Sequence, residues 1–246
     1  MHVIDLRKIY SPTMRDLYYA PDSYTMPDLE KQLMERLEKI GSELKERFEA
    51  KIDSQDQACQ FHLTKGDVNQ RIHEASHEHD LLILGTRGEH MDLEDILLGS
   101  TFKILISTVK KPVLFLPENS KEFGFEKVLL AYDGSYKAAQ TFKFVADFDK
   151  TYNLQLSVIM CTQSQGRKFE EVNDELRNFL THHQIEFESV LYHGKETAKA
   201  ILEESEKGYD LLCFGGYDSG LMETLLFGSV SQKLLHDAKI SCLMVR

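Results

Sequence analysis

The chain has 246 residues and a formal net charge of −11, with 42% hydrophobic and 28% charged residues, a composition typical of a globular protein with room for two domains of ordinary size. The acidic balance argues against DNA, RNA or anionic membranes as main partners, because no basic patch is available to displace counterions from phosphates. No apolar run approaches the roughly 20 residues that span a bilayer and no signal-peptide core is recognisable, so we expect no membrane partner and a cytoplasmic location.

The first part of the chain has the pattern of an α/β domain that lacks its beginning. A short apolar stretch, His2–Asp5, is followed by a long amphipathic helix, expected over Leu29–Phe48. Three further strands alternate with two helices, at Phe61–Leu63, Ile72–Ala75, Leu81–Leu84, Thr101–Val109 and Val113–Leu116. One strand and one helix are missing relative to the second half. We therefore interpret Met1 as a late start, while the alternative is that His2–Asp5 is itself the first strand.

The second part has a complete alternation of strands and helices. Strands are expected at Lys127–Tyr132, Leu154–Cys161, Phe187–Tyr192, Tyr209–Phe214 and Ile240–Val245. Ser135 is placed to cap the first helix, and the other helices centre on Leu176, Ile201 and Leu234. This alternation predicts an α/β fold with a parallel, doubly wound sheet. We expect two domains, 1–118 and 124–246, joined by a short linker.

A glycine pattern occurs once in each half. Asp210 follows Asp80 by 130 positions, and Gly228 follows Gly99 by 129. Each copy is a short apolar strand, a glycine turn, a loop and a Gly-Ser step into a helix, with the residues Gly85, Gly88, Gly99, Ser100 and Thr101 in the first copy and Gly215, Gly228, Ser229 and Val230 in the second. Backbone N–H groups in such a setting can hold a phosphate.

The assembled pattern resembles the universal stress protein family in a tandem two-domain form. Members that bind nucleotide have Gly-x2-Gly-x9-Gly-Ser/Thr after the fourth strand and an Asp at the end of the first strand, and His2-Val3 resembles the end of the family's second strand. The resemblance implies flavodoxin-like (Rossmann-like) domains with strand order 3-2-1-4-5. It also implies a pseudo-dimer of the two domains, paired through their last strands Val113–Leu116 and Leu243–Val245, and leaves a homodimer open.

The resemblance assigns a nucleotide site to each half. In the second domain it comprises Asp133, Cys161, Gly215, Gly228, Ser229 and Val230. Asp218 stands where the family has its second glycine, and a carboxylate there would repel phosphates, which favours AMP over ATP. In the first domain the matching residues are Val3, Gly85, Gly88, Gly99, Ser100 and Thr101, but the Asp of the first strand is absent and the spacing from Gly88 to Gly99 is one residue longer. This half-site is incomplete.

These features predict a stress-response regulatory protein that binds an adenine nucleotide, AMP or ATP, without efficient catalysis. A scaffold that binds protein partners and no nucleotide is the alternative, and an enzyme of the adenine-nucleotide α-hydrolase group is a third hypothesis. No residue is assigned a catalytic role, because no nucleophile, base or triad is recognisable. No metal is predicted: the four cysteines lack metal spacing, and His73 and His77, one helical turn apart, have no convincing third ligand.

Overall fold

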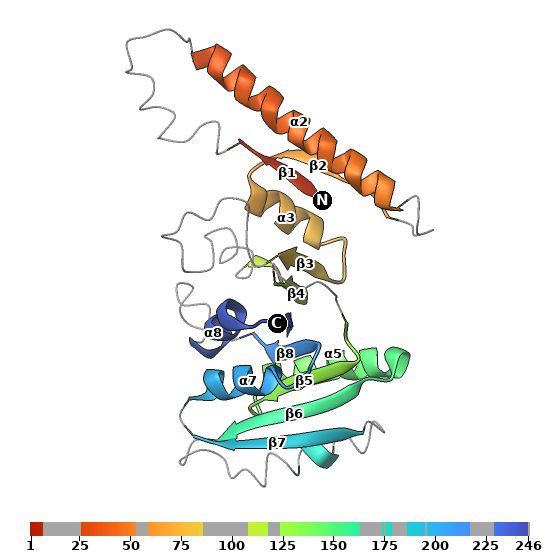
Figure 1. Ribbon diagram of the computed structural model, residues 1–246, viewed down its shortest axis with the longest axis vertical. Helices are drawn as coiled ribbons and strands as arrows, with labels where there is room; N and C mark the ends of the chain where they lie inside the picture. The colour runs from red at the N-terminus through yellow and green to blue at the C-terminus, as the bar shows by residue number, and fades with distance from the viewer. Residues whose placement is uncertain are drawn as a thin grey trace. The chain divides into compact units, whose positions relative to one another are not determined.

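The computed structural model describes residues 1–6, 26–52, 59–85, 108–117, 124–162, 174, 176–178, 186–194, 196–216 and 229–245 (Figure 1). The chain divides into two compact units, Met1–Glu78 and His79–Arg246. The division differs from the repeat in the sequence, because the strands of residues 79–117 join the sheet of the second half. The domain boundaries drawn from the repeat therefore remain a prediction.

The first unit is a small parallel strand pair with two helices. In chain order its elements are β1 (His2–Asp5), α2 (Met26–Ile52), β2 (Leu63–Gly66) and α3 (Val68–Ser76). Strand β1 pairs with β2 in parallel, and both α2 and α3 contact β1. Gly41 of α2 permits a close approach of β2, since a Cβ there would lie 2.8 Å from Cδ1 of Leu63. Asp67 caps α3, where its Oδ1 accepts a hydrogen bond of 3.0 Å from the N–H of Gln70.

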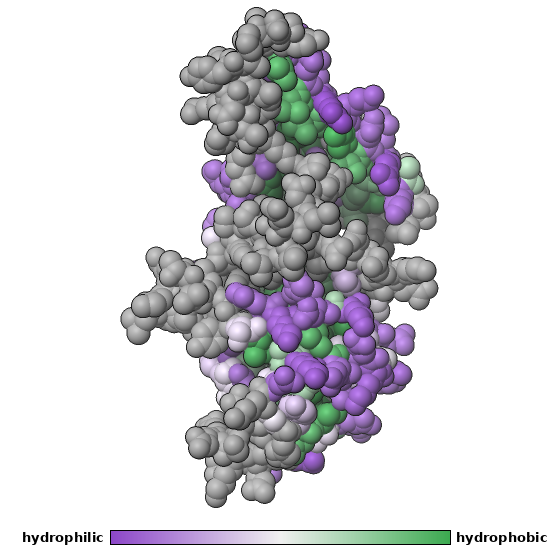
Figure 2. All heavy atoms as spheres, turned by 60° about the vertical axis from the view of Figure 1, so that its left-hand side comes forward, coloured by the Kyte–Doolittle hydropathy of each residue, from purple (hydrophilic) through white to green (hydrophobic). Residues whose placement is uncertain are grey.

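Helix α2 confirms the long amphipathic helix expected from the spacing of its apolar residues. Its leucines at positions 29, 33, 37 and 44 are half-buried, whereas most of its charged residues are exposed. The exposed side has ion pairs one turn apart, such as Lys45–Glu49 at 3.6 Å, which add little stability each. The upper part of Figure 2 shows a band of hydrophobic atoms beside the hydrophilic residues of this unit. Packing of the apolar stripe, rather than surface charge, therefore orders the helix.

The second unit contains a seven-stranded sheet. Its strands in chain order are β3 (Leu82–Gly85), β4 (Val113–Leu116), β5 (Lys127–Tyr132), β6 (Gln155–Thr162), β7 (Phe187–His193), β8 (Leu211–Gly215) and β9 (Ser241–Val245). They lie side by side in the order β3-β4-β9-β8-β5-β6-β7. The five strands of the second half thus have the order 3-2-1-4-5 and pair in parallel, which confirms the doubly wound fold expected for them.

One pairing in this sheet is antiparallel, and it joins the two halves of the chain. Strand β4 pairs with β9, with Leu114 opposite Leu243 and Phe115 opposite Cys242. The pairing expected between the two last strands is therefore present. Among the described residues, positions 1–118 provide four strands, of which β1 and β2 lie in one unit and β3 and β4 in the other.

Helices cover both faces of the seven-stranded sheet (Figure 1). Helix α5 (Tyr136–Tyr152) packs on the face that contains Val128, Leu211 and Cys213. Helices α7 (Thr197–Ser205) and α8 (Ser229–Asp237) contact each other on the opposite side, where Phe214 lies. Strands β8 and β9 are almost entirely apolar, Ser241 being the exception, because both their faces are buried. Among the described helices, none combines the length and apolar composition that crossing a membrane requires.

The core beneath α5 provides a test of the fold. Phe142 is 1% exposed and belongs to the core cluster around Val128 and Cys213. We expect Phe142→Ala to lower the free energy of unfolding by about 3–5 kcal/mol, because it removes a buried ring and leaves a cavity. Tyr136→Ala, at a position of the same helix that is 75% exposed, should change it by less than about 0.5 kcal/mol. Urea unfolding followed by circular dichroism measures both, and equal losses would contradict the assigned core.

Candidate functional site

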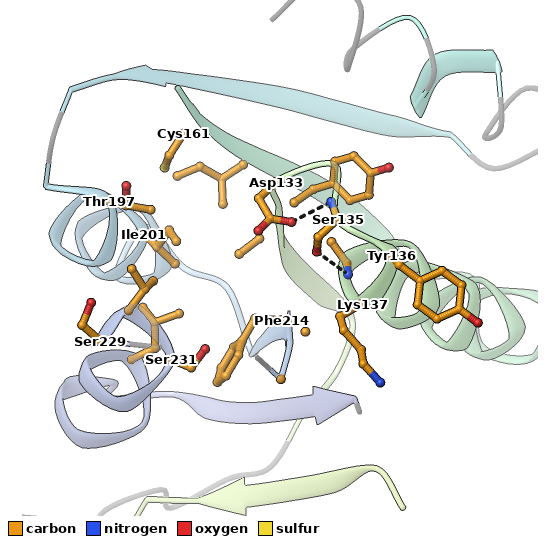
Figure 3. Close-up of a pocket in the computed structure, with 18 residues that line it drawn as sticks. Asp133, Ser135, Tyr136, Lys137, Cys161, Thr197, Ile201, Phe214, Ser229 and Ser231 are labelled. Carbon is orange, nitrogen blue, oxygen red and sulfur yellow. Dashed lines mark hydrogen bonds between the residues drawn. The ribbon is translucent and has the colours of Figure 1, made fainter. Parts of the chain in front are cut away.

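One cavity of the second unit lies at the carboxyl ends of its parallel strands (Figure 3). It has a volume of about 820 Å³, within the range of small-molecule sites. Ala131, Ile159 and Phe214 line it from the sheet, and Ile201 and Leu234 line it from α7 and α8. In a sheet of order 3-2-1-4-5 the strand order reverses between β5 and β8, which is where such folds bind ligands. The sequence places its candidate residues at the same point.

Asp133 stands directly after β5 and begins the turn into α5. Its Oδ1 accepts a hydrogen bond of 2.9 Å from the N–H of Ser135, and Gly134 has the left-handed φ of 76° that this turn requires. Ser135 in turn accepts a hydrogen bond of 3.1 Å at Oγ from the N–H of Ala138, which confirms its expected capping role. Among the described residues, Oδ2 of Asp133 has no hydrogen-bond partner. This second carboxylate oxygen is therefore available to accept a hydrogen bond from a ligand in the cavity.

Three helices begin at this cavity. The first residues of α5, α7 and α8 all line it, namely Tyr136 and Lys137, Thr197, and Ser229 and Val230. The N-terminal end of a helix has a partial positive charge and unsatisfied N–H groups. Asp133 and Lys137 are the charged side chains in the described lining. The site is thus an apolar cavity whose rim presents three positive helix ends and one carboxylate, a combination suited to a phosphate next to hydroxyl groups.

Gly215, at the end of β8, is required by packing whether or not a ligand binds. A Cβ at this position would lie 2.9 Å from the carbonyl carbon of Lys137 and 3.0 Å from the nitrogen of Ala138. These are backbone atoms of the first turn of α5, which cannot move aside cheaply. The glycine therefore allows α5 to begin directly against β8, and this brings the N-terminus of α5 to the cavity.

Cys161 lines the cavity from the end of β6. Burial raises the pKa of its thiol to about 11, because a thiolate is poorly solvated there. The thiol is therefore protonated at neutral pH. Burial likewise raises the pKa of Cys242 to about 12 and that of Cys213 well above its ordinary value, whereas Cys59 is exposed.

The structure brings together most of the predicted site of the second half. Asp133, Cys161, Gly215, Ser229 and Val230 all line the one cavity, while Gly228 and Asp218 lie outside the described residues. In the first half, Val3 is on β1 and Gly85 ends β3, in different units. Gly88, Gly99, Ser100 and Thr101 lie outside the described residues. No complete site is therefore assembled from the described residues of the first half.

Several residues that line the cavity are not among those predicted from the sequence. Thr197 at the start of α7, Ser231 in the first turn of α8 and Tyr132 at the end of β5 also line the cavity. The alternation of strands and helices could have indicated Thr197, because each helix that follows a parallel strand begins at the same edge of the sheet.

The described residues contain no group of three or more His, Cys, Asp or Glu side chains that could hold a metal ion. His73 and His77 of α3 contact each other, with 3.4 Å between their Nε2 atoms. The rings meet edge to face at a centroid distance of 4.8 Å, so the two histidines form an aromatic pair on α3.

Comparison with known proteins identifies the family. The sequence model of the universal stress protein family matches residues 9–117 and 124–246. The chain belongs to the universal stress protein family. This membership assigns it to a stress-response class, and the two matched segments agree with the tandem form expected from the glycine repeat.

The relatives are distant in sequence. A universal stress protein of Synechocystis sp. is 25% identical over 168 residues, which are 68% of this chain and 58% of that protein. The matched part thus spans less than two thirds of the curated relative. A universal stress protein of Archaeoglobus fulgidus has a TM-score of 0.72 at 20% identity, with 94% of this chain and 82% of that chain covered. A protein of unknown function from Pseudomonas aeruginosa has a TM-score of 0.63 at 14% identity, with 92% and 89% covered. These structures support the tandem fold.

The packing of Gly215 gives a prediction at the site. Gly215→Ala should lower the free energy of unfolding by about 1–3 kcal/mol, because the added methyl group meets backbone and forces α5 away from β8. Gly124→Ala is the matched control, since a Cβ there would meet its nearest atom, Cγ of Asp210, at an ordinary 3.5 Å. Chemical denaturation of both variants measures the difference. A Gly215→Ala variant as stable as the control would show that the close approach is not needed.

The thiols give a second prediction. Because the thiolate is the reactive form, iodoacetamide at pH 8 should label the exposed Cys59 well before Cys161, Cys213 or Cys242. Raising the pH towards 11 should accelerate labelling of Cys161, with its pKa of about 11, if the fold persists there. Peptide mass spectrometry over a time course, with circular dichroism at each pH, resolves the four sites. Labelling of Cys161 as fast as Cys59 at pH 8 would contradict its burial.

Proposed function

We propose that the second half of this universal stress protein binds an adenine nucleotide, AMP in preference to ATP, and that the protein acts as a non-catalytic stress-response regulator. The observation that supports this most directly is the convergence of three helix N-termini and the Asp133 carboxylate on one apolar cavity. The family resemblance supports the choice of an adenine nucleotide, and the geometry supports the placement of its parts.

We place the phosphate of the proposed nucleotide at the start of α8. Ser229 and Val230 begin this helix and line the cavity, so their N–H groups and the positive end of the helix favour an anion there. The starts of α5 and α7 add to the positive potential of the same rim. Backbone groups can hold one phosphate without a cluster of basic side chains, which agrees with the acidic composition of the chain.

We place the ribose and the base of the proposed nucleotide on the side of the cavity formed by the sheet. Oδ2 of Asp133 can accept a hydrogen bond from a ribose hydroxyl, while Oδ1 stays bonded to the N–H of Ser135 at 2.9 Å. Ala131, Ile159 and Phe214 provide an apolar surface for the base. The family resemblance assigns the edge of the base to the backbone at Cys161, whose protonated thiol adds no charge.

The cavity offers little for catalysis. Its described lining contains Asp133 as its one carboxylate, and that group is already engaged in the turn into α5. The Cys161 thiol is protonated at neutral pH and is a poor nucleophile in that form. Any hydrolysis of ATP would therefore be slow and incidental.

The nucleotide proposal is tested with Asp133→Asn in the full chain. The substitution keeps an oxygen that can accept the N–H of Ser135 and removes the charge, so AMP affinity should fall by about 1–3 kcal/mol if a buried hydrogen bond to the charged oxygen is lost. Asp147→Asn is the matched control, because Asp147 is an exposed residue of α5 that does not line the cavity. Isothermal titration calorimetry with AMP and ATP measures the affinities. No heat with either nucleotide at millimolar concentration would favour the scaffold alternative.

The preference for AMP rests on Asp218, a sequence position outside the described residues. Replacing this carboxylate with glycine should remove its repulsion of additional phosphates. In the same titration, Asp218→Gly should therefore strengthen ATP binding more than AMP binding. If the unmodified chain already binds ATP much more tightly than AMP, the role assigned to Asp218 is wrong.

A further inference from the structure

Strand β3 forms one edge of the seven-stranded sheet. Among the described residues it pairs with β4 alone, and the N–H of Leu82 donates to the carbonyl of Pro112 at 3.0 Å. Because successive residues of a strand direct their N–H groups to opposite sides, the N–H of Ile83 is directed to the other side. The strand is the apolar run Leu82-Ile-Leu-Gly85, without the lysine or proline that often protects an edge from further pairing.

The repeat in the sequence allows β3 to be compared with β8, its equivalent in the second half. Ile83 of β3 corresponds to Cys213 of β8, and Leu114 of β4 to Leu243 of β9, its partner in the antiparallel pair. On the side away from β9, strand β8 pairs with β5, and α5 covers the face of β8 that contains Cys213. No described element does the same for β3. As a result Cys213 is fully buried, whereas Ile83 is 55% exposed.

Asp80 provides a second, independent observation. Its counterpart Asp210 fastens the start of β8 to β5: the N–H of Lys127 donates to Oδ2 of Asp210 at 2.8 Å, and the N–H of Asp210 donates to the carbonyl of Lys127 at 2.8 Å. Asp80 is exposed and makes no hydrogen bond or ion pair with any residue that the structure describes. The first half thus retains the same acceptor and donor at Asp80, and among the described residues no strand engages them.

An apolar cavity of about 200 Å³ lies beside this edge. Leu81, Ile83 and Leu114 line it from the sheet, and Phe148 and Tyr152 line it from the last turns of α5. Tyr152 is 54% exposed. An antiparallel pair such as β4–β9 has a local two-fold axis perpendicular to the sheet, so a helix related to α5 by that axis would lie on the same face and fill this cavity.

We propose that the β3 edge, Asp80 and the adjoining cavity bind a strand followed by an amphipathic helix, of the β5–α5 kind, from a partner polypeptide. The strand would pair in parallel with β3 and engage Asp80 as Lys127 engages Asp210. The helix would bury its apolar side against Ile83, Leu114 and Tyr152. The occupant is defined by the internal symmetry of the chain and extends the interface that β4 and β9 already form.

The probe is a fluorescein-labelled synthetic peptide of residues 124–152, which is the β5–α5 segment of this chain. Titration of the full-length protein, followed by fluorescence anisotropy, should show saturable binding. Two variants should weaken binding at least about tenfold. Ile83→Lys places a positive charge on the edge strand, and Asp80→Ala removes the carboxylate that would accept the hydrogen bond from the bound strand. Both positions are exposed, so both variants should fold, as circular dichroism will show. Leu191→Lys is the matched control, since Leu191 is 39% exposed on β7 at the opposite edge of the sheet.

Hydrogen exchange gives a readout at the strand itself, because binding should slow exchange at the Ile83 amide of the full chain. The proposal is overturned if the peptide does not bind, or if Leu191→Lys weakens binding as much as Ile83→Lys does, since the peptide would then be adhering to any apolar edge. It is also overturned if sedimentation shows a dimer of the full chain that Ile83→Lys dissociates. In that case the occupant of the edge is a second copy of this chain.

Discussion

The antiparallel pairing of β4 with β9 is the constraint on which the rest of the second unit depends. It places Phe115 and Met244, both fully buried, near the middle of a seven-stranded sheet. Strands this apolar are stable only with a neighbour on each side and cover on both faces. Because β4 takes β9 as its neighbour, β3 and β4 group with the second half of the chain, although the sequence repeat assigns them to the first. Within the described residues β3 pairs with β4 alone, so it forms the edge of the sheet on this side.

The parallel order of the remaining strands determines where chemistry can occur. A parallel crossover begins its helix at the carboxyl end of the preceding strand, so α5, α7 and α8 all begin at one edge of the sheet. Their partial positive charges are concentrated there by topology alone. This chain adds the Asp133 carboxylate to that edge and leaves the cavity between the helices apolar. The composition of the rim, rather than a group of basic side chains, makes the cavity suitable for a single phosphate.

Much of this arrangement could be predicted from the sequence because it depends on local pattern. Period-two and continuous apolar runs located β5, β6 and β8 to within a few residues, the spacing of apolar residues located α2, and Ser135 was identified as a cap from the residues that follow it. What could not be predicted depends on contacts between distant segments. The sequence gives no sign that a Cβ at Gly215 would meet the backbone of Lys137. Nor does it show that Asp210 bonds to Lys127, 83 positions away.

The repeated glycine motif illustrates why a motif alone does not establish a binding site. The close approach of the first turn of α5 fully explains why position 215 is glycine, so a family member that binds no ligand would need this glycine as well. The same holds for Asp210, whose position at the start of β8 is explained by its hydrogen bonds to β5. Both residues are thus explained by the fold and are not evidence for a ligand. Asp133 differs, because the turn into α5 uses only one of its two carboxylate oxygens. A ligand is therefore supported by that second oxygen, which the turn into α5 does not use, together with the positive helix ends that the topology brings to the same cavity.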